Sequence, residues 1–194
     1  MRDTQTRLEE AEKKIREPSF RKNKGLGNEV GYYVFDYPAK DEMIVREWAR
    51  RLREKNNPYA DGFRIAVFDL YDIMIDMLEQ EGYLEQCFDM EERSGMGEIA
   101  EAVVDLLQLG QHDGYLYEHI RNNAPPGSIL ILAGVGKCYP VLRSHHALNN
   151  LHQIFDELPV VLLYPGKYDG QQLVLFGTLK DDNYYRAFRL AGDM

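Results

Sequence analysis

The chain has 194 residues, a mass of 22.5 kDa and 23 basic against 32 acidic residues, which gives a formal charge of −9. This length is typical of one domain, and the acidic balance disfavours binding to nucleic acids and anionic membranes, which carry charge of the same sign. The sequence has no run of about 18 apolar residues that could span a membrane, no apolar N-terminal signal and only two cysteines. We therefore expect one cytoplasmic domain over residues 1–194, with no membrane association and no direct nucleic-acid binding.

Strand-like and helix-like hydrophobic patterns follow one another along the chain. The predicted helices carry apolar residues three or four positions apart, at 3–17, 42–55, 71–81, 83–92, 99–110, 112–121 and 144–158. The predicted strands are short apolar runs between turn residues, at 31–36, 63–68, 129–135, 159–165 and 172–177, with an edge strand within 183–190. The first helix, within residues 1–18, is expected at the periphery of the domain. Asp41 is expected to cap the helix over 42–55.

This alternation predicts an α/β fold, with a mainly parallel open sheet of about five strands flanked by helices. The run ILILAGV (129–135) is apolar throughout, which is typical of a strand buried on both faces of a parallel sheet. A connection between two parallel strands usually contains one helix, whereas the sequence predicts several helices between residues 71 and 121. We therefore expect a helical insert around 71–121.

The segment Gly134-Val135-Gly136-Lys137 follows that strand and resembles the end of a phosphate-binding P-loop. Two of the four defining positions differ, because Ile131 stands at the first glycine and Cys138 at the hydroxyl residue. The glycines are more simply explained by a tight turn at the exit of the strand. Cys138 is expected to be a buried structural thiol rather than a nucleophile.

Arg143, His145 and Asn149 follow this turn, and the last two lie four residues apart on one predicted helix face. Together they could bind a phosphate or a carboxylate, although a capped helix start is the simpler interpretation. The candidate ligand site combines both segments: Gly134, Gly136, Lys137, Arg143, His145 and Asn149. A degenerate nucleotide- or phosphate-binding regulatory domain, sensing its ligand over 134–145, is therefore one functional hypothesis.

Three aspartates follow predicted strands, where open α/β sheets bind ligands. Asp36 and Asp69 end two strands and Asp72 lies just beyond, so a metal-dependent nuclease or hydrolase is a further hypothesis. Helix capping by Asp69 is the simpler alternative. Because no set of metal ligands can be completed from the sequence, we expect no metal and no cofactor.

Three long segments resemble the BrxB family of bacteriophage-exclusion (BREX) defence systems. They are GLGNEVGYYVFDYP (25–38), GVGKCYPVLRSHHALNNL (134–151) and YPGKYDGQQLVLFGTLKDDNYYRAFRL (164–190). The resemblance covers nearly the whole chain, with the segments in the order and spacing of the family.

The resemblance implies a cytoplasmic, non-catalytic subunit of a bacterial or archaeal antiviral complex that confers phage resistance. Its expected partner is the alkaline-phosphatase-like protein PglZ, with the methyltransferase PglX and the ATPase BrxC as further possible partners. Protein–protein interaction would then be the function of the chain, and no catalytic residue is expected.

An aromatic and basic cluster near the end of the chain is the candidate partner-binding site. It consists of Tyr168, Tyr184, Tyr185 and Arg186, with Phe188 close by in sequence. The alternative is that Tyr185 and Phe188 pack the last strand.

Overall fold

A sheet of seven strands forms the centre of the computed structural model, which describes residues 3–21, 31–109, 114–141, 158–180 and 187–192. The strands are β1 (Tyr32–Tyr37), β2 (Arg64–Asp69), β3 (Ser128–Ala133), β4 (Val160–Tyr168), β5 (Leu173–Leu175), β6 (Leu179–Lys180) and β7 (Phe188–Arg189). Five of them are parallel, in the order β2-β3-β4-β1-β7, and β5 and β6 extend β4 as an antiparallel hairpin. The predicted mainly parallel sheet of about five strands is confirmed.

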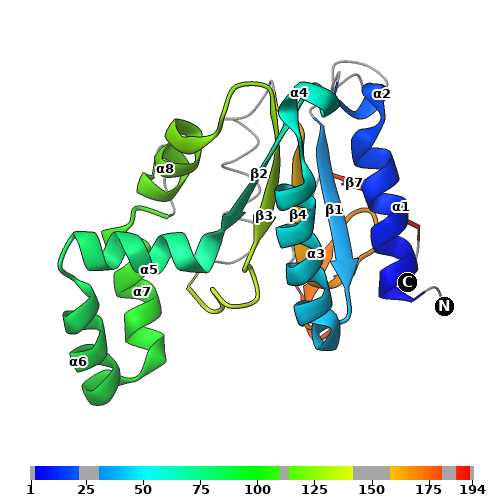
Figure 1. The fold of residues 1–194 in the computed structure, drawn as a ribbon. Helices are drawn as coiled ribbons and strands as arrows, with labels where there is room; N and C mark the ends of the chain where they lie inside the picture. Colours follow the sequence, from blue (N-terminus) through cyan, green and yellow to red (C-terminus); the bar gives the residue numbers. More distant parts are fainter. Residues whose placement is uncertain (1–2, 22–30, 110–113, 142–157, 181–186, 193–194) are drawn as a thin grey trace.

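The helices of the described residues cover both faces of this sheet (Figure 1). They are α1 (Thr4–Arg16), α2 (Pro18–Arg21), α3 (Glu42–Lys55), α4 (Pro58–Asp61), α5 (Leu70–Gln80), α6 (Leu84–Ser94), α7 (Met96–Leu106) and α8 (Tyr115–Asn123), with a 3₁₀ turn at Ala39–Asp41. The bounds of α1, α3, α5, α6, α7 and α8 agree with the predicted helices to within four residues, whereas the single-turn helices α2 and α4 were not predicted. The helix predicted over 144–158 lies almost entirely outside the described residues. No helix in the described part of the chain is long and apolar enough to cross a membrane.

Neighbouring residues of β1, β2, β3 and β4 pack into two separate hydrophobic cores, one on each face of the sheet. On β1, Phe35 packs with α1 and α3, whereas Val34 packs with the helices of the opposite face. All six residues of β3 are buried, so its continuous apolar run correctly indicated burial on both faces. The five parallel strands all end at one edge of the sheet, and Gly134, Gly136 and Lys137 of the candidate ligand site directly follow β3 there.

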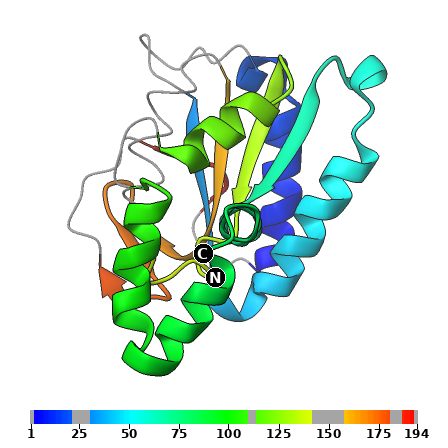
Figure 2. The same cartoon turned by 90° about the vertical axis from the view of Figure 1, so that its left-hand side faces the viewer.

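The predicted helical insert around 71–121 corresponds to α5, α6, α7 and α8, which lie between β2 and β3 in the chain. Helices α5, α6 and α7 extend away from the sheet at the lower left of Figure 1, and Figure 2 views the molecule from their side. Helix α6 contributes no fully buried residue and packs mainly along α7.

The expectation that Asp41 caps α3 is wrong. Its carboxylate accepts a hydrogen bond from the Thr4 hydroxyl of α1, with an Oγ1 to Oδ2 distance of 2.6 Å, and makes no capping bond to α3. Its backbone lies in the preceding 3₁₀ turn, at φ −94° and ψ 7°, rather than in the extended conformation that side-chain capping favours. Asp41 therefore joins two helices instead of starting one.

Helix α1 packs against one face of the sheet, and its inner face is fully buried. Leu8, Ala11 and Ile15 are 0% exposed, and so is Arg7. The Arg7 guanidinium lies 2.6 Å from Oδ1 of Asp36 on β1, donates to the Asp36 carbonyl and stands over the Phe35 ring. Arg7 Nε also donates to the carbonyl of Gly192 at 2.8 Å. One side chain therefore joins α1, β1 and the last described segment.

We predict that Arg7→Met lowers the free energy of unfolding by about 3–5 kcal/mol, because the buried Asp36 carboxylate loses its cation. Urea unfolding of the two proteins measures the difference. The matched control is Arg16→Met on the same helix, because Arg16 is one-third exposed and pairs with Glu12 and Asp61 at 3.2 Å. That loss should stay below about 1 kcal/mol. Equal losses for the two variants would contradict a special role for the buried pair.

Candidate functional site

The carboxyl ends of β2 and β3 place Asp69 and the glycine-rich turn side by side. Asp69 is in register with Ala133, and Gly134 begins the turn directly afterwards. Nζ of Lys137 lies 2.7 Å from Oδ2 of Asp69 and 2.8 Å from Oδ1 of Asp72, and stands over the Tyr71 ring. The lysine that resembled a P-loop lysine is therefore held between two carboxylates.

The electrostatics of this cluster stabilise the charged lysine. Partial burial by itself lowers the pKa of Lys137, but hydrogen bonds and charge from Asp69 and Asp72 outweigh that effect and raise the pKa overall. Asp69 also accepts hydrogen bonds from the amides of Tyr71 and Asp72, so it caps α5, as the simpler interpretation of the sequence proposed.

The backbone of the turn is also engaged in local structure. The amides of Lys137 and Cys138 both donate to the carbonyl of Gly134, at 3.0 and 3.2 Å, and so point into the turn. A P-loop needs such amides for phosphate oxygens. Gly134 has a φ of 81°, and a side chain there would collide with the Asp69 carboxylate. A β-carbon on Gly136 would come within 2.9 Å of Pro165. Close packing against neighbouring side chains therefore explains why both positions are glycine.

The remaining residues of the candidate ligand site, Arg143, His145 and Asn149, lie outside the described residues. The structure therefore brings together Gly134, Gly136 and Lys137 with two aspartates that the sequence analysis had assigned to a different site. Phosphate binding over 134–145 stays a prediction. The carboxylates around Lys137 oppose it electrostatically.

The three aspartates of the metal hypothesis do not converge. Strands β3 and β4 separate β2 from β1, so three strand spacings of about 4.8 Å, or about 14 Å, lie between Asp69 and Asp36. Asp36 is 3% exposed, and its second oxygen accepts the amide of Tyr168 at 3.0 Å. No cluster of three potential metal-ligating side chains occurs among the described residues.

Cys138 lies under the turn, 1% exposed. Burial is the main cause that raises the pKa of its thiol to about 12, and the nearby Asp69 carboxylate adds to the effect. A protonated, buried thiol is a poor nucleophile, because only the thiolate attacks. The geometry agrees with the structural role expected from the sequence.

Of the candidate partner residues, Tyr168 is 1% exposed and its hydroxyl donates to the carbonyl of Ala187 at 2.7 Å. Its side chain belongs to the core and joins β4 to the segment that leads into β7. Tyr184, Tyr185 and Arg186 lie outside the described residues, so their contact with a partner stays a prediction. Phe188 is on β7 and 40% exposed.

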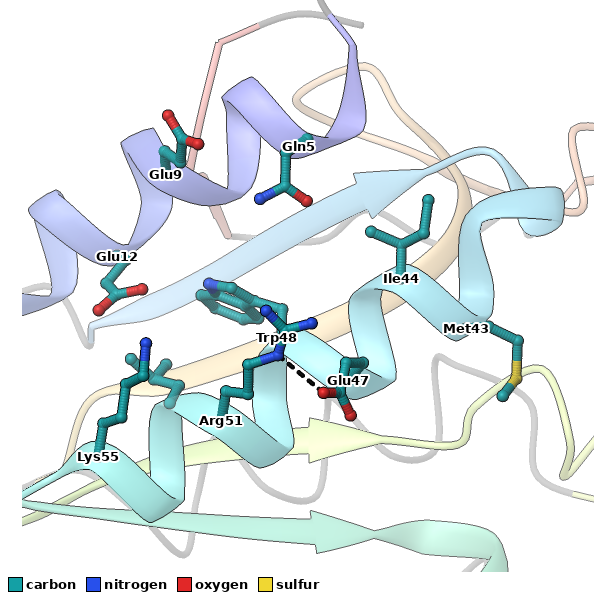
Figure 3. A pocket seen from close by; sticks show the side chains of 10 residues that line it. Gln5, Glu9, Glu12, Met43, Ile44, Glu47, Trp48, Arg51 and Lys55 are labelled. Carbon is teal, nitrogen blue, oxygen red and sulfur yellow. Dashed lines mark hydrogen bonds and ion pairs between the residues drawn. The ribbon is translucent and has the colours of Figure 1, made fainter.

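Two hollows on the surface were not predicted. The first, of about 490 Å³, lies between α1 and α3 (Figure 3). Its walls combine apolar and charged side chains, namely Gln5, Glu9, Glu12, Met43, Ile44, Glu47, Trp48, Arg51, Leu52 and Lys55. The second, of about 740 Å³, lies at the carboxyl ends of β1 and β4 and includes Lys40, Lys167 and Arg189.

The sequence analysis also missed Arg7, which appeared to be one charge among many in a polar helix. The position of Arg7 on the predicted helix could have indicated its burial. Arg7 shares a helix face with Leu8, Ala11 and Ile15, at spacings of one, four and eight residues. A charge within an apolar stripe indicates a buried partner elsewhere in the fold.

Comparison with known proteins decides the family. The family model described as "BREX protein BrxB" matches residues 66–190. The chain belongs to the BrxB family. It is similar to a BREX protein BrxB of Bacillus cereus (strain H3081.97), with 47% identity over 98% of both chains. It is also similar to a BREX protein BrxB of Escherichia coli O9:H4 (strain HS), with 32% identity over 96% of this chain and 91% of the relative. No solved structure matches it.

We predict that Lys137→Met lowers the free energy of unfolding by about 1 kcal/mol, because Asp69 and Asp72 lose their shared cation. Since folding raises the pKa of Lys137, its contribution is complete below the unfolded pKa of about 10.4 and disappears as the pH rises through the folded pKa. Urea unfolding at pH 8 measures the full difference. Lys167→Met is the control, because no ion pair of Lys167 is found in the described residues. A thermal shift with phosphate or MgATP that Lys137→Met abolishes would contradict this structural role.

We further predict that Cys138 resists thiol reagents in the folded protein. With a pKa of about 12, about one molecule in 10⁴ carries the thiolate at pH 8. A Cys87→Ser variant should react with a disulfide reagent only after unfolding in urea, whereas Cys138→Ser should react sooner through the half-buried Cys87. Rapid stoichiometric reaction of folded Cys87→Ser would instead indicate an accessible, activated thiol.

Proposed function

We propose that this chain is a non-catalytic subunit of a BREX complex and acts by binding PglZ. Membership of the BrxB family makes it a component of a BREX system. In that role it would contribute to phage resistance through protein–protein contact. Contact with PglX or BrxC would be secondary, and any contact with DNA would come through these partners.

One observation carries the non-catalytic part of the proposal. The acidic groups at the carboxyl edge that suit acid–base or metal chemistry are bound to cations of the same chain. Asp36 is paired with Arg7, and Asp69 and Asp72 share Lys137. Catalytic groups need open coordination positions or a free proton-transfer path towards a substrate. These pairs instead bind one segment of the chain to another.

Large apolar side chains at the surface support the interaction part of the proposal. Met43 is 70% exposed and Ile44 is 46% exposed, and both line the hollow between α1 and α3 (Figure 3). Phe88 on α6 is 55% exposed. Exposed apolar side chains beside charged residues are typical of the centres and rims of protein interfaces.

We predict that the chain and PglZ elute together from size exclusion as one species, whose mass by light scattering is a whole-number combination of the two proteins. The chain alone and PglZ alone, at the same concentrations, are the controls. The mixture should hydrolyse ATP no faster than PglZ alone. Two unmixed peaks at micromolar concentration would overturn the proposal, as would turnover that requires Asp69 or Asp72.

A further inference from the structure

The excess of acidic over basic residues in this protein is concentrated in one part of the chain. Residues 70–106, which form α5, α6 and α7 and are called here the acidic arm, contain eleven acidic residues and one basic residue, a formal charge of −10. The remaining 157 residues contain 21 acidic and 22 basic residues, a formal charge of +1. The net negative charge of −9 therefore comes entirely from the segment that extends away from the sheet (Figures 1 and 2).

These carboxylates face solvent. All eleven acidic residues of the acidic arm are exposed: Asp72, Asp76, Glu79, Glu81, Glu85, Asp89, Glu91, Glu92, Glu98, Glu101 and Asp105. Within the described residues, only Asp72 and Asp89 among them have an ion-pair partner, Lys137 and Arg93 respectively. Helix α3 differs, because there Glu47 and Glu54 are paired with Arg50 at 2.6–2.7 Å.

Helix α6 carries an apolar anchor among these charges. Cys87 and Met90 pack back against the hydrophobic core, whereas Phe88 points away from that side and is 55% exposed. Glu85 and Glu92 precede and follow Phe88 by three and four residues, so the three side chains form one stripe along the helix. A large exposed aromatic side chain flanked by charged residues has the composition of the centre and rim of a protein interface.

We propose that the acidic arm is the docking surface for a protein partner with a basic face, and that Phe88 inserts into an apolar socket on that face. The carboxylates of the acidic arm repel one another. A basic protein surface relieves that repulsion and is therefore the electrostatically complementary partner. A nucleic acid has the wrong charge, and a simple cation offers no socket for Phe88. The inference rests on the proposed function for the identity of the partner, which is a BREX subunit.

The test measures the affinity of the full chain for purified PglZ, PglX and BrxC by biolayer interferometry at 0.1 and 0.5 M NaCl. The variants are Phe88→Ala and the double variant Glu85→Gln/Glu92→Gln. Glu17→Gln/Glu54→Gln, on exposed positions at the end of α1 and on α3, removes the same charge outside the acidic arm. Equal circular dichroism spectra and melting temperatures establish that all proteins are folded.

We expect the wild-type complex to weaken at least tenfold between the two salt concentrations, because screening removes the attraction between exposed charges. Phe88→Ala should weaken it at least tenfold, as an aromatic anchor does, and Glu85→Gln/Glu92→Gln about three- to tenfold. The control variant should stay within twofold of wild type.

The outcomes separate the two proposals. Binding to PglZ that is indifferent to salt and to both arm variants overturns the inference and leaves the proposed function intact. Arm-dependent binding to PglX or BrxC but not to PglZ supports the inference and overturns the choice of PglZ. No binding to any of the three subunits overturns both.

Discussion

The burial of one arginine constrains the outer layer of this fold. Arg7 has no exposed surface, so its charge must be neutralised and its donors must be satisfied inside the protein. Asp36 provides the charge, and the carbonyls of Asp36 and Gly192 accept the remaining bonds. The same carboxylate accepts the amide of Tyr168 from β4. The packing of α1, the end of β1 and the last described segment therefore depend on a single ion pair.

The same principle applies to the polar residues at the carboxyl edge of the sheet, Asp36, Asp69 and Asp72, which are ion-paired within the chain. Parallel strands bring their polar ends to one edge, where many α/β proteins bind ligands. Here the chain brings its own cations to that edge, Arg7 from α1 and Lys137 from the turn after β3. Neutralised carboxylates hold segments together but leave little capacity for a substrate. Under the proposed function, the contacts with a partner lie on the surface of the protein rather than at this edge.

Local patterns were sufficient to predict most of the fold, because the apolar runs and helical stripes map directly onto strands and helices. The continuous run of β3 even indicated burial on both faces. What local patterns could not predict were contacts between segments far apart in sequence. Asp41 bonds to Thr4, 37 residues away, rather than to its own helix, and Lys137 lies 65 residues from Asp72. The composition gives the net charge of the chain. The fold shows that the helices with the excess of acidic residues, α5, α6 and α7, extend away from the sheet.

The contact between Arg7 and Gly192 joins residues separated by 185 positions in the chain. On the ribosome, α1 is made long before its acceptor in the last described segment. Contacts of such long sequence separation close large loops and are slow to form. During that interval the apolar face of α1 lacks Leu190 and Ala191, which belong to the same hydrophobic core. Nascent chains halted before Gly192 should therefore be a preferred substrate for chaperones that bind exposed amphipathic helices.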